Sequence, residues 1–303
     1  DEAGNTVFKQ PISATVDSLP IDPMSDVPAG YLENQRDRPG GFTGEPDVLD
    51  TWFTSSLTPQ IAASWGEEQD NSSHLFPTDL RPQAHDIIRT WAFYTIVKSM
   101  LHHDSVPWRN IMISGWVLDP DRKKMSKSVG NVVTPIGLLD QYGADPVRYW
   151  AASHTLGADT AFDEEKFKAG RRFVTKIYNA SKFVLTQSGP MGPISVELDR
   201  SFLSELQAVV ERSTEAYERY EYSNGLQYAE DFFWNAFTDN YIELVKRRAR
   251  DENKHDERAS AIASLRLALN ILLRLFAPIT PTITEEVWSW TFAKETGYKS
   301  VHT

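Results

Sequence analysis

Apolar side chains recur at helical spacing through most of the second half of the chain, and this pattern limits the possible fold more than any other. One stripe between residues 261 and 278 consists of Ile262, Leu265, Leu269, Leu272 and Phe276. It ends just before Pro278, a residue that cannot continue a helix. Because strand-like alternation fades after about residue 150, the sequence predicts an all-helical bundle there.

Other segments of the second half also show patterns typical of helices. Residues 163–187 begin with acidic side chains, which favour a helix N-terminus, and then repeat apolar positions at helical intervals. Residues 199–220 and 225–250 predict two further long helices. Thr282 and Glu285 have the spacing of a capping box, so we expect them to open the last helix.

The first half of the chain differs in composition and in the spacing of its apolar residues. Residues 1–46 are rich in Pro, Gly and Asp, which predicts extended connecting segments with one short strand near residues 12–16. Further on, a long apolar-faced helix over residues 85–104 precedes a β-rich run over residues 110–119. Alternation of strands and helices is typical of an α/β fold with a parallel sheet.

The length of 303 residues suits two domains, and we expect an α/β domain over 1–150 followed by an all-α domain over 151–303. The chain has no cysteine, which excludes disulfides and thiolate metal sites and favours a reducing compartment. No apolar run is judged long enough to span a bilayer. The chain begins at Asp1 and not at a methionine, so we expect it to be a piece of a longer protein.

The net charge of −11 argues against a protein that binds nucleic acid over its whole surface. Any polyanion must therefore meet a local basic patch, and the sequence has three, at residues 122–127, 166–182 and 246–250. Histidines stand at 85, 102 and 103, but no third ligand lies at a suitable spacing. We therefore predict no metal site.

The first of these patches lies in the string DRKKMSKSVGNVV, which begins at Asp121. Its lysines are flexible point charges that can follow a phosphate chain, and its serines add hydroxyl donors. Gly130 and Asn131 permit a turn. The plain alternative is a solvated basic loop. The full K-M-S-K-S string after a β-rich run is far more specific, and it resembles the second signature of the class I aminoacyl-tRNA synthetases.

Five further blocks agree with that resemblance and fall in the order of the Val/Ile/Leu/Met subgroup. They are DVLDTWFTSS (47–56), HDIIRTW (85–91), SGWVLD (114–119), FFWNAFTDNYIELVK (232–246) and LFAPITPTITEEVW (275–288). Within the subgroup the blocks look most like those of the valine enzymes, with the isoleucine enzymes as the near alternative. The resemblance implies the second half of a Rossmann-type catalytic domain over 1–150 and a helical-bundle anticodon-binding domain over 151–303.

The resemblance also implies site residues. ATP would contact Lys124, Met125, Ser126, Lys127 and Ser128 in the loop, together with His85 and Asp86. Lys124 and Lys127 would be catalytic, because they stabilise charge on the phosphates. Asp86 could equally be an ordinary helix N-cap.

The same family would place valine in a pocket made of Trp52, Ile87 and Trp91. Two indoles and a β-branched side chain form an apolar slot that rejects larger side chains by overlap. The plain alternative is core packing, since Ile87 and Trp91 are spaced i,i+4 on an apolar helix face.

Transfer RNA would meet Lys246, Arg247, Arg248 and Arg250, and also Arg171 and Arg172. Basic side chains at the end of a helix are favourable by themselves, so capping is the plain alternative for residues 246–250.

The implied partners are the valine tRNA, L-valine and ATP, the last with Mg²⁺. We further expect a cytoplasmic location, no membrane, and a monomeric parent protein. The other family signature, His-x-Gly-His, is absent from the chain, so we expect the isolated chain to be inactive. Two alternatives stay open: a piece of an isoleucine enzyme, and a stand-alone tRNA-binding module without ligase activity.

Overall fold

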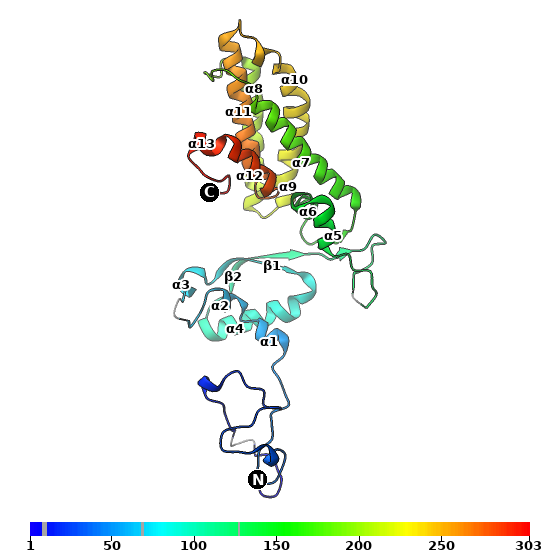
Figure 1. Cartoon of the computed structure of the whole chain (residues 1–303), viewed down its shortest axis with the longest axis vertical. Coiled ribbons are helices and arrows are strands. Elements are labelled where there is room, and N and C mark those ends of the chain that lie inside the picture. The colour runs from blue at the N-terminus through cyan, green and yellow to red at the C-terminus, as the bar shows by residue number, and fades with distance from the viewer. Residues whose placement is uncertain (8–10, 68–69, 127) are drawn as a thin grey trace. The chain divides into compact units, whose positions relative to one another are not determined.

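The computed structural model describes residues 1–7, 11–67, 70–126 and 128–303 (Figure 1). The chain divides into two compact units. The first contains Asp1–Asp79 and Ile87–Arg109, and the second contains Leu80–Asp86 and Asn110–Thr303.

The start of the first unit is irregular, as the sequence predicts. Its regular elements before residue 46 are two 3-10 turns, η1 (Val16–Ser18) and η2 (Glu33–Gln35). The strand predicted near residues 12–16 is wrong. Ile12 and Val16 are both largely exposed, and no neighbouring strand is present in the described part of residues 1–46 to pair with this segment.

Short helices follow in the same unit. They are α1 (Thr51–Ser55), α2 (Thr58–Ala62), α3 (Ser72–Leu75), the π-helical turn η4 (Ile88–Ala92) and α4 (Phe93–His103). Asp50 caps α1, because its carboxylate accepts the Trp52 N–H at 2.7 Å. The long helix predicted over residues 85–104 is therefore present, but its first turns are a 3-10 turn, η3 (His85–Ile87), and η4.

Strands β1 (Thr78–Ala84) and β2 (Trp108–Ser114) form a two-stranded sheet. Their beginnings adjoin, since Thr78 N–H donates to the Pro107 carbonyl, and their ends adjoin, since Ser114 Oγ lies 3.5 Å from the Gln83 carbonyl. The strands therefore run in the same direction, with α4 as the crossover. This βαβ arrangement agrees with the predicted parallel sheet.

In the second unit, β3 (Val117–Leu118) pairs in parallel with β4 (Thr160–Ala161). Gly115 precedes β3 where the chain passes the carbonyl of Ala158. A Cβ atom at residue 115 would lie 2.2 Å from that carbonyl oxygen, so only glycine fits there.

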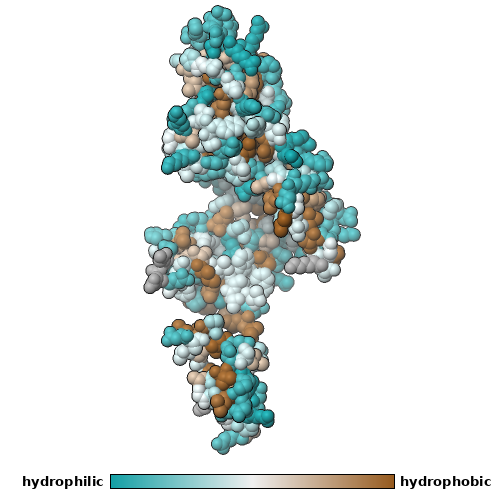
Figure 2. All heavy atoms as spheres, viewed as in Figure 1, coloured by the Kyte–Doolittle hydropathy of each residue, from teal (hydrophilic) through white to brown (hydrophobic). Residues whose placement is uncertain are grey.

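The rest of the second unit is helical, as predicted. Its helices are α5 (Pro135–Tyr142), α6 (Ala144–Ala152), α7 (Glu164–Leu185), α8 (Glu197–Glu218), α9 (Tyr222–Asp231), the π-helical η5 (Phe232–Tyr241), α10 (Ile242–Val245), the 3-10 turn η6 (Arg248–Arg250), α11 (His255–Phe276), α12 (Pro281–Trp290) and α13 (Phe292–Thr296). One apolar core joins the helices from α6 to α13, and its fully buried side chains include Phe173, Phe233 and Phe276. The visible face of the bundle is largely hydrophilic (Figure 2).

All five residues of the predicted stripe on α11 are buried in this core. By length and composition alone α11 could also cross a membrane, so the expectation that no apolar run is long enough was wrong. Here α11 packs against α7, α8, α9 and α12, as the central helix of a soluble-type bundle does.

The predicted capping box at Thr282 and Glu285 is wrong. Helix α12 starts at Pro281, and its first free N–H groups are capped by Asp145 from α6. The two carboxylate oxygens of Asp145 accept from Thr282 N–H at 3.1 Å and Ile283 N–H at 2.7 Å. Glu285 instead accepts from Ser300.

Candidate functional site

The loop from Arg122 to Ser128, here called the cationic loop, is held at its base by two side chains. Asp119 accepts the Lys123 N–H at 2.8 Å and the Asn131 side-chain amide at 2.7 Å. Asn131 in turn accepts the Ser126 N–H at 3.0 Å. The Asp119–Asn131 pair thus joins the two ends of the loop.

Hydrogen bonds favour the ionised form of Asp119 at the foot of the cationic loop. The bonds from the Lys123 backbone and from Asn131 lower the pKa of Asp119 below its ordinary value of 3.8. Asp119 is 7% exposed, so the pair is shielded although the loop it holds is not. A loop fixed at its base and open at its tip can present cations to a ligand without itself being buried.

Lys124 contacts two side chains outside the cationic loop. Its Nζ lies 3.6 Å from Oδ2 of Asp86 and 4.2 Å from the ring centre of Trp116. His85 also belongs to this cluster: its ring centre lies 4.7 Å from that of Trp116 in a tilted arrangement, and its Nδ1 lies 3.1 Å from the Ser114 carbonyl oxygen. The structure therefore brings together three predicted nucleotide contacts, Lys124, His85 and Asp86.

The serines of the loop lie next to each other. Ser126 Oγ and Ser128 Oγ are 3.1 Å apart, and Ser126 Oγ also accepts the Val129 N–H. Both hydroxyls can rotate to donate to a phosphate oxygen at little cost in free energy, because their present hydrogen bonds are only to neighbouring residues of the same loop. Met125 is half-buried beside them. Lys127, the second predicted catalytic lysine, lies outside the described residues.

The predicted amino-acid pocket lies in the first unit. Trp52, Ile87 and Trp91 are all half-buried there. The indole N–H of Trp91 donates to the Ser55 carbonyl at 2.9 Å, which ties η4 to the end of α1, the helix that carries Trp52. Turns of π-helix are rare and occur often at functional sites, and η4 holds Trp91 in one.

Lys98 adds a second tie to α1 that sequence reasoning did not find. Its Nζ donates to the Phe53 carbonyl at 2.6 Å and lies 3.4 Å over the Phe53 ring. The side chain is only 8% exposed, and burial lowers the pKa of Lys98. Lys98 thus caps the C-terminal end of α1 and helps to fix the helix that carries Trp52.

The basic stretch at residues 246–250 is less free than its sequence indicates. Arg248 bonds to the fully buried Asp199, and Lys246 bonds to Glu243. Arg250 donates to Gln187 at 3.3 Å and lies over the Phe183 ring. The Arg247 side chain is exposed and makes no hydrogen bond or ion pair within the described residues. The geometry therefore favours a structural role for Arg248 and leaves Arg247 as the accessible cation.

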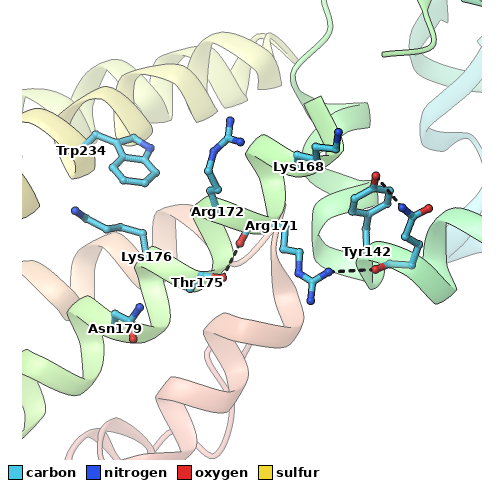
Figure 3. Close-up of a pocket in the computed structure, with 9 residues that line it drawn as sticks. Tyr142, Lys168, Arg171, Arg172, Thr175, Lys176, Asn179 and Trp234 are labelled. Carbon is cyan, nitrogen blue, oxygen red and sulfur yellow. Dashed lines mark hydrogen bonds between the residues drawn. The ribbon is translucent and has the colours of Figure 1, made fainter. Parts of the chain in front are cut away.

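Arg171 and Arg172 lie beside an open hollow of about 590 Å³ along α7, here called the α7 hollow (Figure 3). Its lining residues are Gln141, Tyr142, Lys168, Arg171, Arg172, Thr175, Lys176, Asn179 and Trp234. Both arginines are exposed, and Arg171 makes one long bond of 3.4 Å to the Gln141 carbonyl. Trp234 lies in the FFWNAFTDNYIELVK block, but the sequence alone assigns it no role.

Within the described ranges, no three His, Asp or Glu side chains gather as a metal site would require. Two carboxylates beside the cationic loop have partners: Asp86 pairs with Lys124, and Asp119 accepts hydrogen bonds at the loop base. The described residues therefore offer no cluster of three such ligands for a divalent cation.

Comparisons with known proteins agree with this geometry. The family described as tRNA synthetases class I (I, L, M and V) matches residues 21–163, and the anticodon-binding domain of tRNA ligase matches residues 199–303. A valine–tRNA ligase of Thermobifida fusca is 54% identical over 96% of this chain and 33% of that protein. One of Salinispora tropica is 51% identical over 96% of this chain and 34% of that protein.

Solved structures share the fold. The LeuRS of Agrobacterium radiobacter K84, in a ternary complex with tRNA and LeuAMS, has a TM-score of 0.65 at 24% identity, over 83% of this chain and 33% of that one. Methionyl-tRNA synthetase of Mycobacterium tuberculosis with methionyl-adenylate has a TM-score of 0.67 at 18% identity, over 82% of this chain and 52% of that one. These similarities confirm the predicted fold class, α/β followed by all-α.

Proposed function

Because the chain belongs to the class I tRNA synthetases of the I, L, M and V group, we propose that it acts as part of a valine–tRNA ligase. The observation that carries the proposal is the 54% identity to a valine–tRNA ligase over 96% of the chain. The chain spans about a third of the length of the curated relatives it matches, so the activity belongs to a protein larger than these 303 residues.

The proposed reaction has two steps. The valine carboxylate attacks the α-phosphorus of ATP, the bond to the β-phosphate oxygen breaks, and pyrophosphate leaves as valyl-adenylate forms. A hydroxyl at the 3′ end of the valine tRNA then attacks the acyl carbon and releases AMP. Catalysis of the first step rests on positioning and on stabilising charge at the phosphates.

In this proposal the cationic loop meets the phosphates. Lys124 leaves Asp86, balances charge on the departing pyrophosphate and shares that role with Lys127. Ser126 and Ser128 donate hydroxyl hydrogen bonds to phosphate oxygens, and Met125 packs behind them. The clustering of Lys124 with His85 and Asp86 supports this assignment.

His85 and Asp86 would take the nucleoside end of ATP. Once Lys124 has moved to phosphate, the Asp86 carboxylate is free to accept hydrogen bonds from ribose hydroxyls. Mg²⁺ would arrive with ATP and be held by its phosphates and by water, as Mg²⁺ commonly is.

Trp52, Ile87 and Trp91 would hold the valine side chain. The ties from Trp91 and Lys98 to α1 support this, because a pocket that selects by shape needs fixed walls. Such an apolar slot excludes a larger side chain by overlap but discriminates against threonine only about 100-fold.

The valine tRNA is the proposed macromolecular partner, with Arg171, Arg172 and Arg247 as its most accessible contacts. Residues 1–150 would complete the catalytic domain and residues 151–303 would bind the anticodon region, although the 150/151 division falls inside α6. We further propose a cytoplasmic, monomeric parent protein.

The two alternatives are weaker. Eight relatives between 47% and 54% identical are all valine–tRNA ligases, which disfavours the isoleucine enzyme. The same relatives disfavour a stand-alone module without a ligase parent.

The experiment is a comparison of tRNA binding and of amino-acid activation. The 303-residue chain should bind a valine-tRNA transcript more tightly than an isoleucine-tRNA transcript in a fluorescence titration at fixed salt. It should show no valine-dependent ATP–pyrophosphate exchange by itself. Equal binding of both transcripts, or preference for the isoleucine one, would sink the assignment to valine.

A further inference from the structure

We propose that Lys98 is a positioning residue that sets the size limit of the amino-acid pocket, because it holds helix α1 and with it Trp52. The inference rests on the proposed function, since it takes Trp52, Ile87 and Trp91 as the walls of that pocket. It adds a residue outside the walls that decides how large an amino acid they admit.

Helix α1 is too short to keep its own direction. It has five residues, Thr51–Ser55, and isolated helices of fewer than about 12 residues are marginal in water. Asp50 caps its N-terminal end. The last carbonyl groups of a helix have no partner within the helix, so the C-terminal end needs donors from elsewhere. The direction in which α1 carries Trp52 therefore depends on the side chains that supply those donors.

Two side chains of one helical stretch supply donors to α1, which packs against η4 and α4 (Figure 1). The Trp91 indole N–H donates to the Ser55 carbonyl at 2.9 Å. Lys98 Nζ donates to the Phe53 carbonyl at 2.6 Å. Trp91 and Lys98 are about two helical turns apart in the continuous run of η4 and α4, so they lie on the same side of it. Two such bonds prevent α1 from pivoting about either one.

Lys98 occupies a position where a lysine costs free energy. It is 8% exposed, and no carboxylate pairs with its ammonium group among the described residues. The Phe53 ring, whose centre lies 3.4 Å from Nζ, stabilises the cation only in part. Burial still lowers the pKa of Lys98, because a low dielectric disfavours the charged form. An apolar side chain would fill this space at lower cost, so stability alone does not explain a lysine here.

Loss of the lysine would not leave the Phe53 carbonyl without a donor. Ser56 Oγ also donates to it. That local bond moves with the end of α1, whereas the bond from Lys98 ties α1 to α4. Removing Lys98 should therefore allow α1 to shift while its backbone stays paired. A change in pocket size can thus be separated from a loss of folding.

The expected effect depends on the size of the amino acid. A pocket that rejects larger side chains by overlap needs walls that are held in place. If α1 can shift, Trp52 can move back, and isoleucine, which is one methylene larger than valine, is admitted more readily. Threonine and valine have the same size, so movement of a wall should leave their ratio unchanged.

The test is amino-acid-dependent ATP–pyrophosphate exchange, without tRNA, by the full-length protein that contains this chain. In Lys98→Met the ratio of kcat/KM for valine to that for isoleucine should fall about tenfold, as one methylene is worth in an apolar pocket. The KM for valine should rise, while kcat and the KM for ATP stay within about twofold. The valine-to-threonine ratio should not change. Lys98→Arg keeps a donor and should restore most of the valine-to-isoleucine ratio.

Ser99→Ala is the matched control. Ser99 is also buried on α4, but its hydroxyl donates to the Ser105 carbonyl and not to α1. Its loss should leave both amino-acid ratios unchanged. Urea denaturation of the 303-residue chain supplies the second control. Its midpoint should not fall in Lys98→Met, because a buried cation without an acid partner is removed.

A second variant reaches the same contact from the other side. Phe53→Leu removes the ring beside the ammonium group but keeps the carbonyl. The valine-to-isoleucine ratio should then fall about threefold, as a cation–π contact is worth. If Lys98→Met does not fold, Phe53→Leu decides, and an unchanged ratio in it contradicts the inference.

Three further results would overturn the inference. They are an unchanged valine-to-isoleucine ratio in Lys98→Met, an equal loss of activity with all three amino acids, and an equally large fall of the ratio in Ser99→Ala. If the full-length protein activates valine best and Lys98→Met keeps its ratio, the inference fails and the proposed function stands. If the full-length protein prefers isoleucine but Lys98→Met still shifts the ratio, the inference stands and the assignment to valine fails.

Discussion

Lys124 Nζ lies 3.6 Å from Asp86 Oδ2, although 38 positions separate the two residues in the sequence. The Lys124 and Asp86 side chains are 51% and 40% exposed, so their attraction is screened by water and is worth at most about 1 kcal/mol. The Trp116 ring supports the ammonium from another side. A cation held this weakly can move to a phosphate at small cost.

The first prediction follows from that weak contact. Asp86→Asn should change the free energy of unfolding by less than about 1 kcal/mol in urea denaturation. Lys124→Met should lower ATP affinity about tenfold in a titration at low salt, because one phosphate partner is lost. Lys123→Met, a neighbouring lysine without these contacts, is the control. A loss of more than about 2 kcal/mol of stability in Asp86→Asn would mean that the pair is structural.

The second prediction concerns the base of the cationic loop. Asp119→Ala and Asn131→Ala should each speed hydrogen exchange of the Lys123 and Ser126 amides by roughly tenfold, measured by mass spectrometry, because their acceptors are lost or displaced. Since hydrogen bonds lower the pKa of Asp119, this protection is present above pH 3.8 and is lost as the pH falls through the lowered value.

A reciprocal exchange tests the same pair more strictly. In the double variant Asp119→Asn with Asn131→Asp, residue 119 can still accept the Lys123 N–H and donate to residue 131, which can still accept the Ser126 N–H. Slow exchange should therefore return in the double variant. If the double variant exchanges as fast as the alanine variants, the pair does not hold the loop.

The third prediction concerns the cap of α12. Asp145→Ala leaves the Thr282 N–H and the buried Ile283 N–H without their acceptor and should destabilise the chain by about 1–2 kcal/mol in urea denaturation. Asp145→Asn keeps one acceptor and should cost less. Asp140→Ala, an exposed acid on α5, should change stability by less than about 0.5 kcal/mol. Equal values for residues 145 and 140 would contradict the capping role.

The fourth prediction separates two neighbouring arginines. Arg248→Met leaves the fully buried Asp199 carboxylate without its cation and should cost about 3 kcal/mol of stability. Arg247→Met should cost less than about 0.5 kcal/mol but weaken binding of the valine tRNA. If Arg248→Met keeps its stability and loses only tRNA binding, then Arg248 is an RNA contact and not a structural residue.

The fifth prediction is a pH dependence. Burial raises the pKa of Glu230 above its ordinary value of 4.5. Between 4.5 and the raised value the folded state binds more protons than the unfolded state, so stability should fall as the pH rises through this window. Glu230→Gln should flatten that fall in denaturation curves taken between pH 4 and pH 8. Glu286→Gln, at the exposed Trp290 pair, should leave the curve unchanged.

The bundle could be predicted because burial alone dictates its pattern. A helix that covers a core must repeat apolar residues every three or four positions, and the stripe on α11 does so from Ile262 to Phe276. The start of α12 could not be predicted in this way. Its cap comes from Asp145, 137 positions before Thr282, and local sequence carries no trace of so distant an acceptor.

In the candidate site, too, contiguous motifs could be predicted from the sequence, whereas contacts between distant residues could not. A contiguous motif identified the cationic loop. The contacts of Trp116 with Lys124 and of Asp119 with Asn131 depend on the fold and could not be predicted from the motif. Arg247 and Arg248 look alike in sequence. Only the position of the buried Asp199 shows that the second of them is committed.

Helix α11 shows how the order of elements along a chain can protect a protein during its synthesis. By length and composition alone this segment could cross a membrane. Its partners α7, α8 and α9 all precede it, so a ribosome releases them first. When α11 emerges, the apolar surface that receives it already exists, and packing into the bundle can compete with capture by a lipid bilayer.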